Sequence, residues 1–155
     1  MARKDPALAF CFRVTITKSS LGVKLDKASG LFKSVSGLGV ETEVVDFKEG
    51  GVNDMTHKLV GGAKYKNIVL KRGVVGPELM DWRSNWESGL ASGKGKESLR
   101  TNGFIEQLDT QGNTIAKWEF TGGWPCKWEM SEFDAGKNEV SMETLEIAHS
   151  GVKRA

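Results

Sequence analysis

Acidic side chains are concentrated in one stretch of the chain, and carboxylates both bind hard metal ions and act as general acids or bases. The stretch VETEVVDFKEG contains Glu41, Glu43, Asp46 and Glu49. Because side chains alternate along a strand, Glu41 and Glu43 would share one face while Asp46 would lie on the other. The four carboxylates therefore do not easily converge on a metal ion. The spacing favours a solvated or channel-facing wall.

Other residue types that perform chemistry are present without the spacing that chemistry requires. His57 and His149 have no histidine, cysteine or paired carboxylate beside them at metal-ligand spacing. The segment GLASGKGKES resembles a phosphate-binding loop, but three residues separate Gly89 from Gly93 where the pattern requires four. No serine lies in a G-x-S-x-G turn. We therefore predict no catalytic residue, no metal and no cofactor.

The two cysteines and the charge balance restrict the cellular context. Cys11 and Cys126 each lie in a run of alternating apolar residues, which favours two buried, reduced thiols over a disulfide and fits synthesis in the cytoplasm. The N-terminal residues lack the cleavage site of a signal peptide. No apolar run approaches the roughly 20 residues of a membrane-spanning helix. A net charge of +2 gives no support to sequence-specific nucleic-acid binding.

Tryptophan is the one residue type left that could form a ligand platform. A row of indole rings can stack on sugars or nucleobases. In this chain the tryptophans follow the period of the predicted helix and strands, which favours packing in the core or between subunits. They are Trp82, Trp86, Trp118, Trp124 and Trp128.

Short strands account for most of the remaining pattern. With 155 residues the chain suits a single domain, residues 1–155. Apolar and polar residues alternate with a period of two in about eight segments, which predicts half-buried strands. These segments are residues 10–17, 31–36, 40–48, 66–72, 103–109, 114–120, 124–130 and 138–149.

One segment has the pattern of a helix instead. In GPELMDWRSNWESGL, Leu79, Trp82 and Trp86 form one apolar stripe, Pro77 suits the first turn and Gly89 is placed to end the helix. We expect a helix over residues 77–88 that packs on a sheet. Because the turns are short and a single helix cannot supply repeated crossovers, the strands should be antiparallel. The predicted fold is mainly β, an antiparallel β-sandwich or flattened barrel with one flanking helix.

The last predicted strand changes phase along its length. Val140 and Met142 fall on one phase of the alternation, whereas Leu145 and Ile147 fall on the other. Such a change predicts a β-bulge, or a strand that leaves one sheet and joins another.

Several segments, in order, resemble the contractile tail-tube protein family, which forms the tubes of contractile phage tails and related injection particles. They are SVSGL, DFKEGG, KLVGGAKYKNIVLKRG, the tryptophan-bearing helix, WEFTGGWPCKW and NEVSMETLEIAHSG. The resemblance covers residues 10–151. It implies a ring-forming tail-tube fold, in which six copies close into a ring and rings stack into a hollow tube inside a contractile sheath.

The resemblance also implies which residues and proteins make contacts. Residues 46–57 correspond to an extended loop that reaches an adjacent subunit or the next ring, with Gly50 and Gly51 giving backbone freedom. The implied partners are the chain itself, the sheath, baseplate or hub, tube-terminator and tape-measure proteins, and protein effectors or DNA in the lumen, without specific nucleic-acid readout or a membrane span. The implied contact residues are Asp46, Phe47, Lys48, Glu49, Gly50, Gly51, Val52, Asn53 and Met55.

The expected function is therefore structural: an inner-tube subunit of an injection system or phage-tail-like particle, not an enzyme. Such a subunit would be made in the cytoplasm without a signal peptide and assembled into a particle that stays there or is released. Two alternatives remain open at this point. One is the ring protein of type VI secretion, and the other is a monomeric β-barrel module that binds a ligand in a tryptophan-lined pocket.

Overall fold

The computed structural model describes residues 11–18, 30–48, 50, 56–74, 76–93, 95, 99–131, 135–136 and 141–155. These residues form ten strands and one helix. The strands are β1 (Cys11–Lys18), β2 (Leu31–Phe32), β3 (Ser34–Ser36), β4 (Val40–Lys48), β5 (Thr56–Tyr65), β6 (Ile68–Gly73), β7 (Thr101–Leu108), β8 (Thr114–Met130), β9 (Met142–Ala148) and β10 (Gly151–Arg154). The helix is α1 (Glu78–Ala91).

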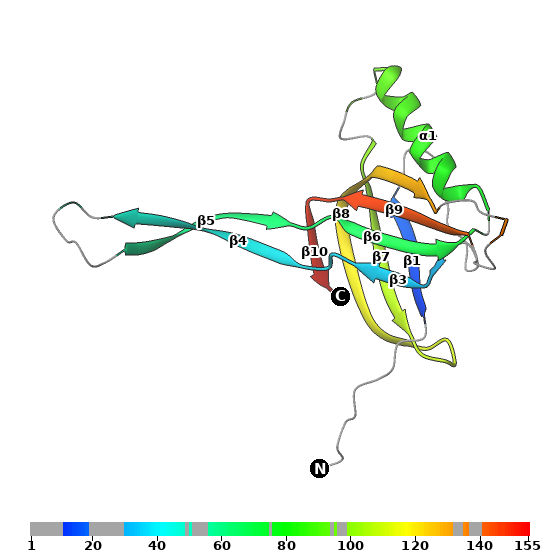
Figure 1. Cartoon of the computed structure of the whole chain (residues 1–155), viewed down its shortest axis with the longest axis horizontal. Helices are drawn as coiled ribbons and strands as arrows, with labels where there is room; N and C mark the ends of the chain where they lie inside the picture. Colours follow the sequence, from blue (N-terminus) through cyan, green and yellow to red (C-terminus); the bar gives the residue numbers. More distant parts are fainter. Residues whose placement is uncertain are drawn as a thin grey trace, which may run out of the picture.

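The body of the molecule is one continuous path of antiparallel strands, in the order β2-β1-β7-β8-β9-β6-β3, with β10 paired to β8 (Figure 1). The 17-residue strand β8 joins two sheets. Its first part pairs with β7 and β10, and its last part pairs with β9. The fold-class prediction is confirmed: the described residues are mainly β, with antiparallel sheets, one helix and no closed barrel.

The core follows from the period of two. In β9 every second side chain is buried, and β7 follows the same alternation from Thr101 to Ile105, so each strand turns one face inward and the other outward. The inward faces of both sheets meet side chains from the helix. The core cluster consists of Val14, Phe32, Ile68, Leu70, Leu79, Trp82, Ile105, Phe120, Leu145 and Ile147.

The helix lies on the sheet as expected but continues beyond the predicted end. Leu79 and Trp82 are buried, and the ring of Trp86 stacks on that of Trp124 in β8, with centroids 4.9 Å apart. Gly89 does not end the helix; it is buried inside it. The glycine that follows the last turn is Gly93, whose φ of +79° is the left-handed conformation that glycine adopts at a helix C-terminus.

The phase change in the last long strand has a different cause from the one predicted. β9 keeps a constant register against β6 from Ile68↔Ile147 to Gly73↔Met142, so β9 has no bulge there. The inward position that breaks the apolar pattern belongs to Glu143, which is 2% exposed. The strand that changes sheets is β8, and its register against β9 shifts between Pro125 and Lys127.

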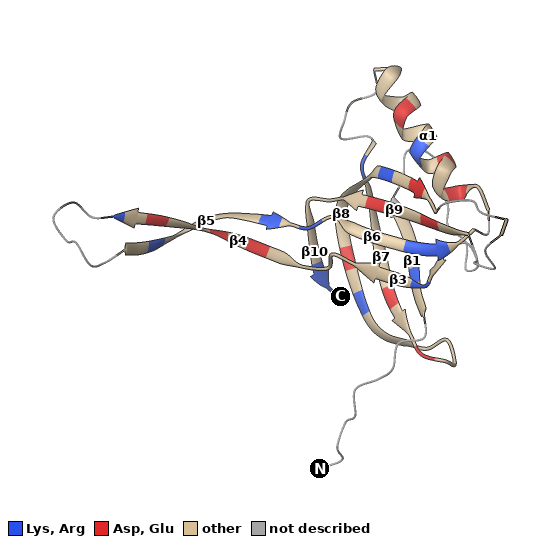
Figure 2. Cartoon of the chain, in the orientation of Figure 1, with Lys and Arg blue, Asp and Glu red and all other residues tan. Residues whose placement is uncertain are grey.

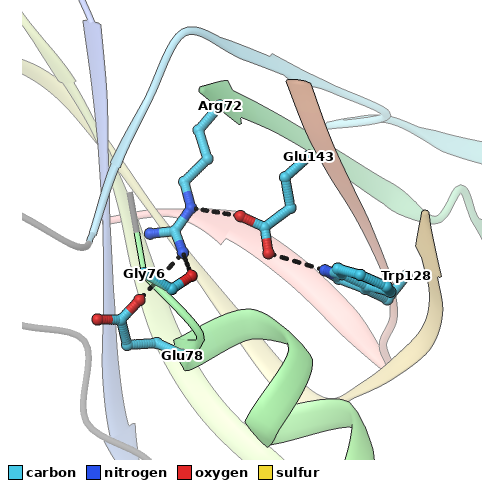
Figure 3. Close-up of polar contacts among 5 residues, drawn as sticks. All are labelled: Arg72, Gly76, Glu78, Trp128 and Glu143. Atoms are coloured by element: carbon cyan, nitrogen blue, oxygen red, sulfur yellow. Dashed lines mark hydrogen bonds and ion pairs between the residues drawn. The ribbon is translucent and has the colours of Figure 1, made fainter. Parts of the chain in front are cut away.

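Glu143 is buried because it belongs to a polar network around Arg72 (Figure 3). Arg72 Nε donates to Glu143 Oε2 at 3.1 Å, and Nη2 donates to Glu78 Oε2 at 3.2 Å. Trp128 Nε1 donates to the other oxygen of Glu143 at 2.8 Å. The network therefore ties β6, β8 and β9 to the first turn of the helix.

Two of the observed strands, β5 and β10, were not predicted. β10 is the short C-terminal strand, and β5 occupies part of the segment expected to be a loop, so residues 46–48 and 56–57 of the predicted loop 46–57 lie in paired strands.

Cys11 and Cys126 are both free, as predicted, but half-buried.

Candidate assembly interface

β4 and β5 form a two-stranded sheet of their own, which we call the arm, and it projects away from the body (Figure 1). The strands pair from Val40↔Tyr65 near the body to Lys48↔Thr56 at the far end. Every described arm residue is exposed except the half-buried Gly61. A two-stranded hairpin is at best marginally stable in water without further packing. The arm is therefore the part of the described chain that most needs a partner.

Large apolar side chains are exposed along the arm to an unusual extent. Val60 is 88% exposed, Val40 59% and Phe47 52%. Burying one Val, Leu or Phe side chain contributes about 1.5–3 kcal/mol, so several such residues represent a substantial unrealised stabilisation. Contiguous exposed apolar surface of this kind marks an interaction site.

The apolar residues change face halfway along the arm. Residues directly opposite each other on paired strands share a face. Near the body the apolar face carries the pairs Val40↔Tyr65 and Val44↔Val60. Toward the far end the opposite face is apolar, with the pair Val45↔Leu59 followed by Phe47.

The pairing of the two strands is interrupted at the same place. The register shifts between Thr42 and Val44, where Glu43 faces the glycine pair Gly61 and Gly62. A Cβ on Gly61 would lie 2.8 Å from the carbonyl oxygen of Glu43, so glycine is required for this bulge. Bulges increase strand twist, and the two strands cross over in Figure 1. We call the exposed apolar residues of these two half-faces together the apolar side; they are Val40, Val44, Val45, Phe47, Leu59, Val60 and Tyr65.

In each half of the arm the face opposite the apolar residues is charged, and we call these residues the charged side: Glu41, Glu43 and Lys64 near the body, and Asp46, Lys48 and Lys58 toward the far end. Figure 2 shows such charged positions along both strands of the arm. Acidic residues of β4 face basic residues of β5 at Glu41↔Lys64 and Asp46↔Lys58. Lys64 Nζ lies 3.9 Å from Glu43 Oε2, and both side chains are more than half exposed. Exposed pairs of this kind contribute about 0–1 kcal/mol, so their main effect is to keep this side hydrated. Glu41, Glu43 and Asp46 are all exposed, as a solvated wall requires, whereas Glu49 lies outside the described residues.

The structure places some of the predicted contact residues and leaves others outside the described residues. Asp46, Phe47 and Lys48 lie at the far end of β4, and Gly50 is exposed with no atom near its Cβ position. The predicted residues Glu49, Gly51, Val52, Asn53 and Met55 lie outside the described residues. Sequence reasoning missed the contribution of β5. The available signal was the apolar pair Leu59 and Val60, and the glycine pair of the bulge that follows it obscured the strand.

The sheet edges offer a second kind of contact. Within the described residues β2, β3 and β10 each pair with one strand, so each has an edge of unpaired backbone groups. Such edges pair readily with another chain. The body therefore presents edges that extend its sheets, in addition to the arm.

A cavity of about 350 Å³ lies beside the helix. It is lined by Trp86, Leu90, Leu99, Arg100 and Trp124. The stacked tryptophan pair forms its apolar wall, and Arg100 Nη1 donates to Ser150 Oγ at 3.1 Å. This is the tryptophan-lined pocket that the monomeric binding module would require.

The described residues provide no arrangement for metal chemistry or for crossing a membrane by a helix. No group of three or more His, Cys, Asp or Glu residues in the described ranges could hold a metal ion. No helix found there is long and apolar enough to span a bilayer. His149 Nε2 is instead hydrogen-bonded to the carbonyl oxygen of Lys66 at 2.8 Å.

Comparisons with known proteins give a family match and similar folds. Residues 8–153 match the family model described as T4-like virus tail tube protein gp19. No curated protein sequence matches the chain.

Among solved structures, similarity extends over almost the whole chain. A chain in the structure of the anti-feeding prophage baseplate has a TM-score of 0.76 at 24% identity, covering 99% of this chain and 97% of that one. A chain in the extended sheath–tube complex of the extracellular contractile injection system PVC has a TM-score of 0.70 at 22% identity, covering 97% and 91%. A type six secretion system protein has a TM-score of 0.53 at 14% identity, covering 94% and 83%. These similarities show a shared fold.

Proposed function

The chain belongs to the T4-like virus tail tube protein family, and on that premise we propose that it forms stacked hexameric rings that make a hollow conduit. The conduit would be the inner tube of a contractile injection system or phage-tail-like particle, propelled outward when a surrounding sheath contracts. As a tail tube protein the chain is structural and not an enzyme. The resemblance inferred from the sequence is thereby confirmed.

The observation that supports assembly most strongly is the arm. It is a free-standing two-stranded sheet with an apolar side and a charged side. A second copy of the chain is the natural partner, because each copy offers the same unpaired sheet edges and the same arm. One heterologous contact closes a ring, and a second contact along the ring axis repeats without closing and builds a tube.

The similar solved structures indicate the other partners. They come from a baseplate, a sheath–tube complex, and tube-terminating assemblies of injection systems. We accordingly propose sheath, baseplate or hub, and terminator proteins as partners of this chain. A tape-measure protein, and effector proteins or DNA as cargo, complete the proposal. The assembled particle would reside in the cytoplasm or be released from it.

A pair of neighbouring substitutions on β5 tests the arm. Leu59 lies on the apolar side and is 51% exposed, whereas Lys58 lies on the charged side opposite Asp46. Leu59→Gln should raise the concentration required for tube growth about tenfold, because one buried leucine contributes about 1.5–2 kcal/mol to each contact. Lys58→Gln introduces the same side chain at the adjacent position, on the charged side, and should leave tube growth near the wild-type level.

Tube growth is measured by negative-stain microscopy over a concentration series. Equal loss of tubes in both variants, or in neither, would show that the apolar side does not carry the contact. The type VI alternative shares the fold, and the family match favours the tail tube. The monomeric binding module relies on the cavity beside Trp86; it would be favoured if the chain stayed monomeric and bound a small apolar compound there.

A further inference from the structure

The arm is continuous with the body, because β3–β6 and β4–β5 are two halves of one long hairpin. Ser36 faces Val69 in the body, and Val40 faces Tyr65 in the arm. Four positions separate Ser36 from Val40, and four separate Tyr65 from Val69, so the pairing keeps its register between the halves. What changes is the direction of the ribbon, which leaves the body at this point (Figure 1).

We call the connecting residues 37–39 and 66–67, together with Glu146 and His149, the joint. One backbone bond joins the two connectors: Lys66 N donates to Gly39 O at 3.3 Å. A second bond lies within the first connector, where Gly39 N donates to Gly37 O at 2.8 Å. Gly37 has a φ of +84°, and a Cβ there would overlap the carbonyl oxygen of Asn67. The connectors therefore cross at a distance that only glycine permits.

Two side-chain contacts fix the connectors to the body. Asn67 Nδ2 donates to Glu146 Oε1 in β9 at 2.7 Å, a short bond because the acceptor is charged. His149 Nε2 donates to the carbonyl oxygen of Lys66 at 2.8 Å, and its ring lies 5.7 Å from that of Tyr65, the last residue of the arm. Both contacts reach from the end of β9 to the second connector. They act beyond Ile68, where the pairing of β6 with β9 ends, while Leu38 of the first connector packs against the core cluster.

The geometry points to a positioning role for Asn67 and His149: they preset the direction of the arm before any partner binds. This inference rests on the proposed function for its biological use, since the apolar side must face the neighbouring copy to be buried. An arm that sampled many directions would be competent for docking only part of the time. If the competent fraction fell to about one tenth, the apparent dissociation constant would rise about tenfold.

The test measures the direction of the arm by double electron–electron resonance. Spin labels are placed at Lys48, in the arm, and at Glu129, an exposed residue of β8. They are attached through a ketone-bearing amino acid so that Cys126, whose Sγ lies 3.9 Å from Asn67 Nδ2, is retained. Labelled chain is diluted into excess unlabelled chain, so each distance is measured within one subunit in rings or in monomers.

The wild-type chain should give a single narrow distance distribution, and Asn67→Ala combined with His149→Phe should broaden it. His149→Gln keeps an N–H donor, so its distance distribution should be narrower than that of His149→Phe. Asn113→Ala is the matched control, because it removes another asparagine-to-carboxylate bond, to Asp109 in the β7–β8 turn. Circular dichroism confirms that each variant is folded.

The two possible failures are distinguishable. If the wild-type chain and the double variant give distance distributions of the same width, whether broad or narrow, Asn67 and His149 do not position the arm. This conclusion holds even if tubes form. A narrow wild-type distribution that the double variant broadens supports the joint even if the chain never forms rings, in which case the proposed function fails instead.

Discussion

At the scale of single residues, Arg72 and Glu143 form a charged pair in the middle of an otherwise apolar core. Each is 2% exposed. The guanidinium also contacts Glu78 and the carbonyl oxygen of Gly76, and it lies 5.5 Å from the ring of Phe32. Arg72 therefore fixes the start of the helix against the sheets, and it supplies the cation that compensates the buried Glu143 carboxylate.

Removing one partner should destabilise the fold strongly. Arg72→Met leaves the Glu143 carboxylate buried without its cation, and we expect a loss of about 3–5 kcal/mol in the free energy of unfolding. Adding Glu143→Leu should recover part of this loss, because a buried apolar pair carries no desolvation penalty. Urea denaturation of the single and double variants measures both values. Additive losses in the double variant would contradict the coupling.

A second residue-scale prediction concerns Cys126. Burial raises the pKa of the Cys126 thiol, and the nearby Glu146 carboxylate acts in the same direction. Because the thiolate is disfavoured in the folded state, stability linked to this group is present below the unfolded pKa of about 8.5 and is lost as pH rises toward the folded value.

The unfolding free energy of the wild-type chain should accordingly fall faster above pH about 8.5 than that of Cys126→Ser. Alkylation of Cys126 at neutral pH should also be slower in the folded chain than in denaturant. Parallel stability curves for the two proteins would exclude this linkage.

At the scale of elements, the sequence predicts those that carry a strong period. The alternation of β7 and β9 and the apolar stripe of the helix were sufficient to place them, because each buries one face. β5 was missed because its bulge at Gly61 interrupts the period, and because both faces of the arm are exposed. From the sequence alone, the phase change between Met142 and Leu145 predicts a β-bulge or a change of sheet, since the buried partner of Glu143, Arg72, is distant in sequence.

The far end of the arm provides an element-scale prediction. Deleting residues 50–53 should leave the fold intact by circular dichroism, because the core cluster lies in the body. Tube growth should be abolished, since by resemblance this segment reaches the adjacent subunit or the next ring. Replacing the same residues by glycine and serine is the control that separates length from side-chain contacts. Tubes of normal length from the deleted chain would show that the loop assignment is wrong.

At the scale of the whole molecule, the fold class and the family could both be predicted from the sequence. The period of two, the single helix and the order of motifs were sufficient for these. That β4 and β5 leave the body could not be predicted, because alternating residues in an arm and in a body sheet look the same. The sequence also does not reveal that the exposed apolar residues change face between Val44 and Val45, because this depends on how β4 pairs with β5.

We propose that another copy of the chain covers the apolar side of the arm. The most direct test of this proposal is the mass of the purified wild-type chain, measured by light scattering after size exclusion over a range of concentrations. We expect the purified wild-type chain to form hexamers or longer tubes at high concentration. A 16.9 kDa monomer at every concentration, even with baseplate present to nucleate growth, would contradict it.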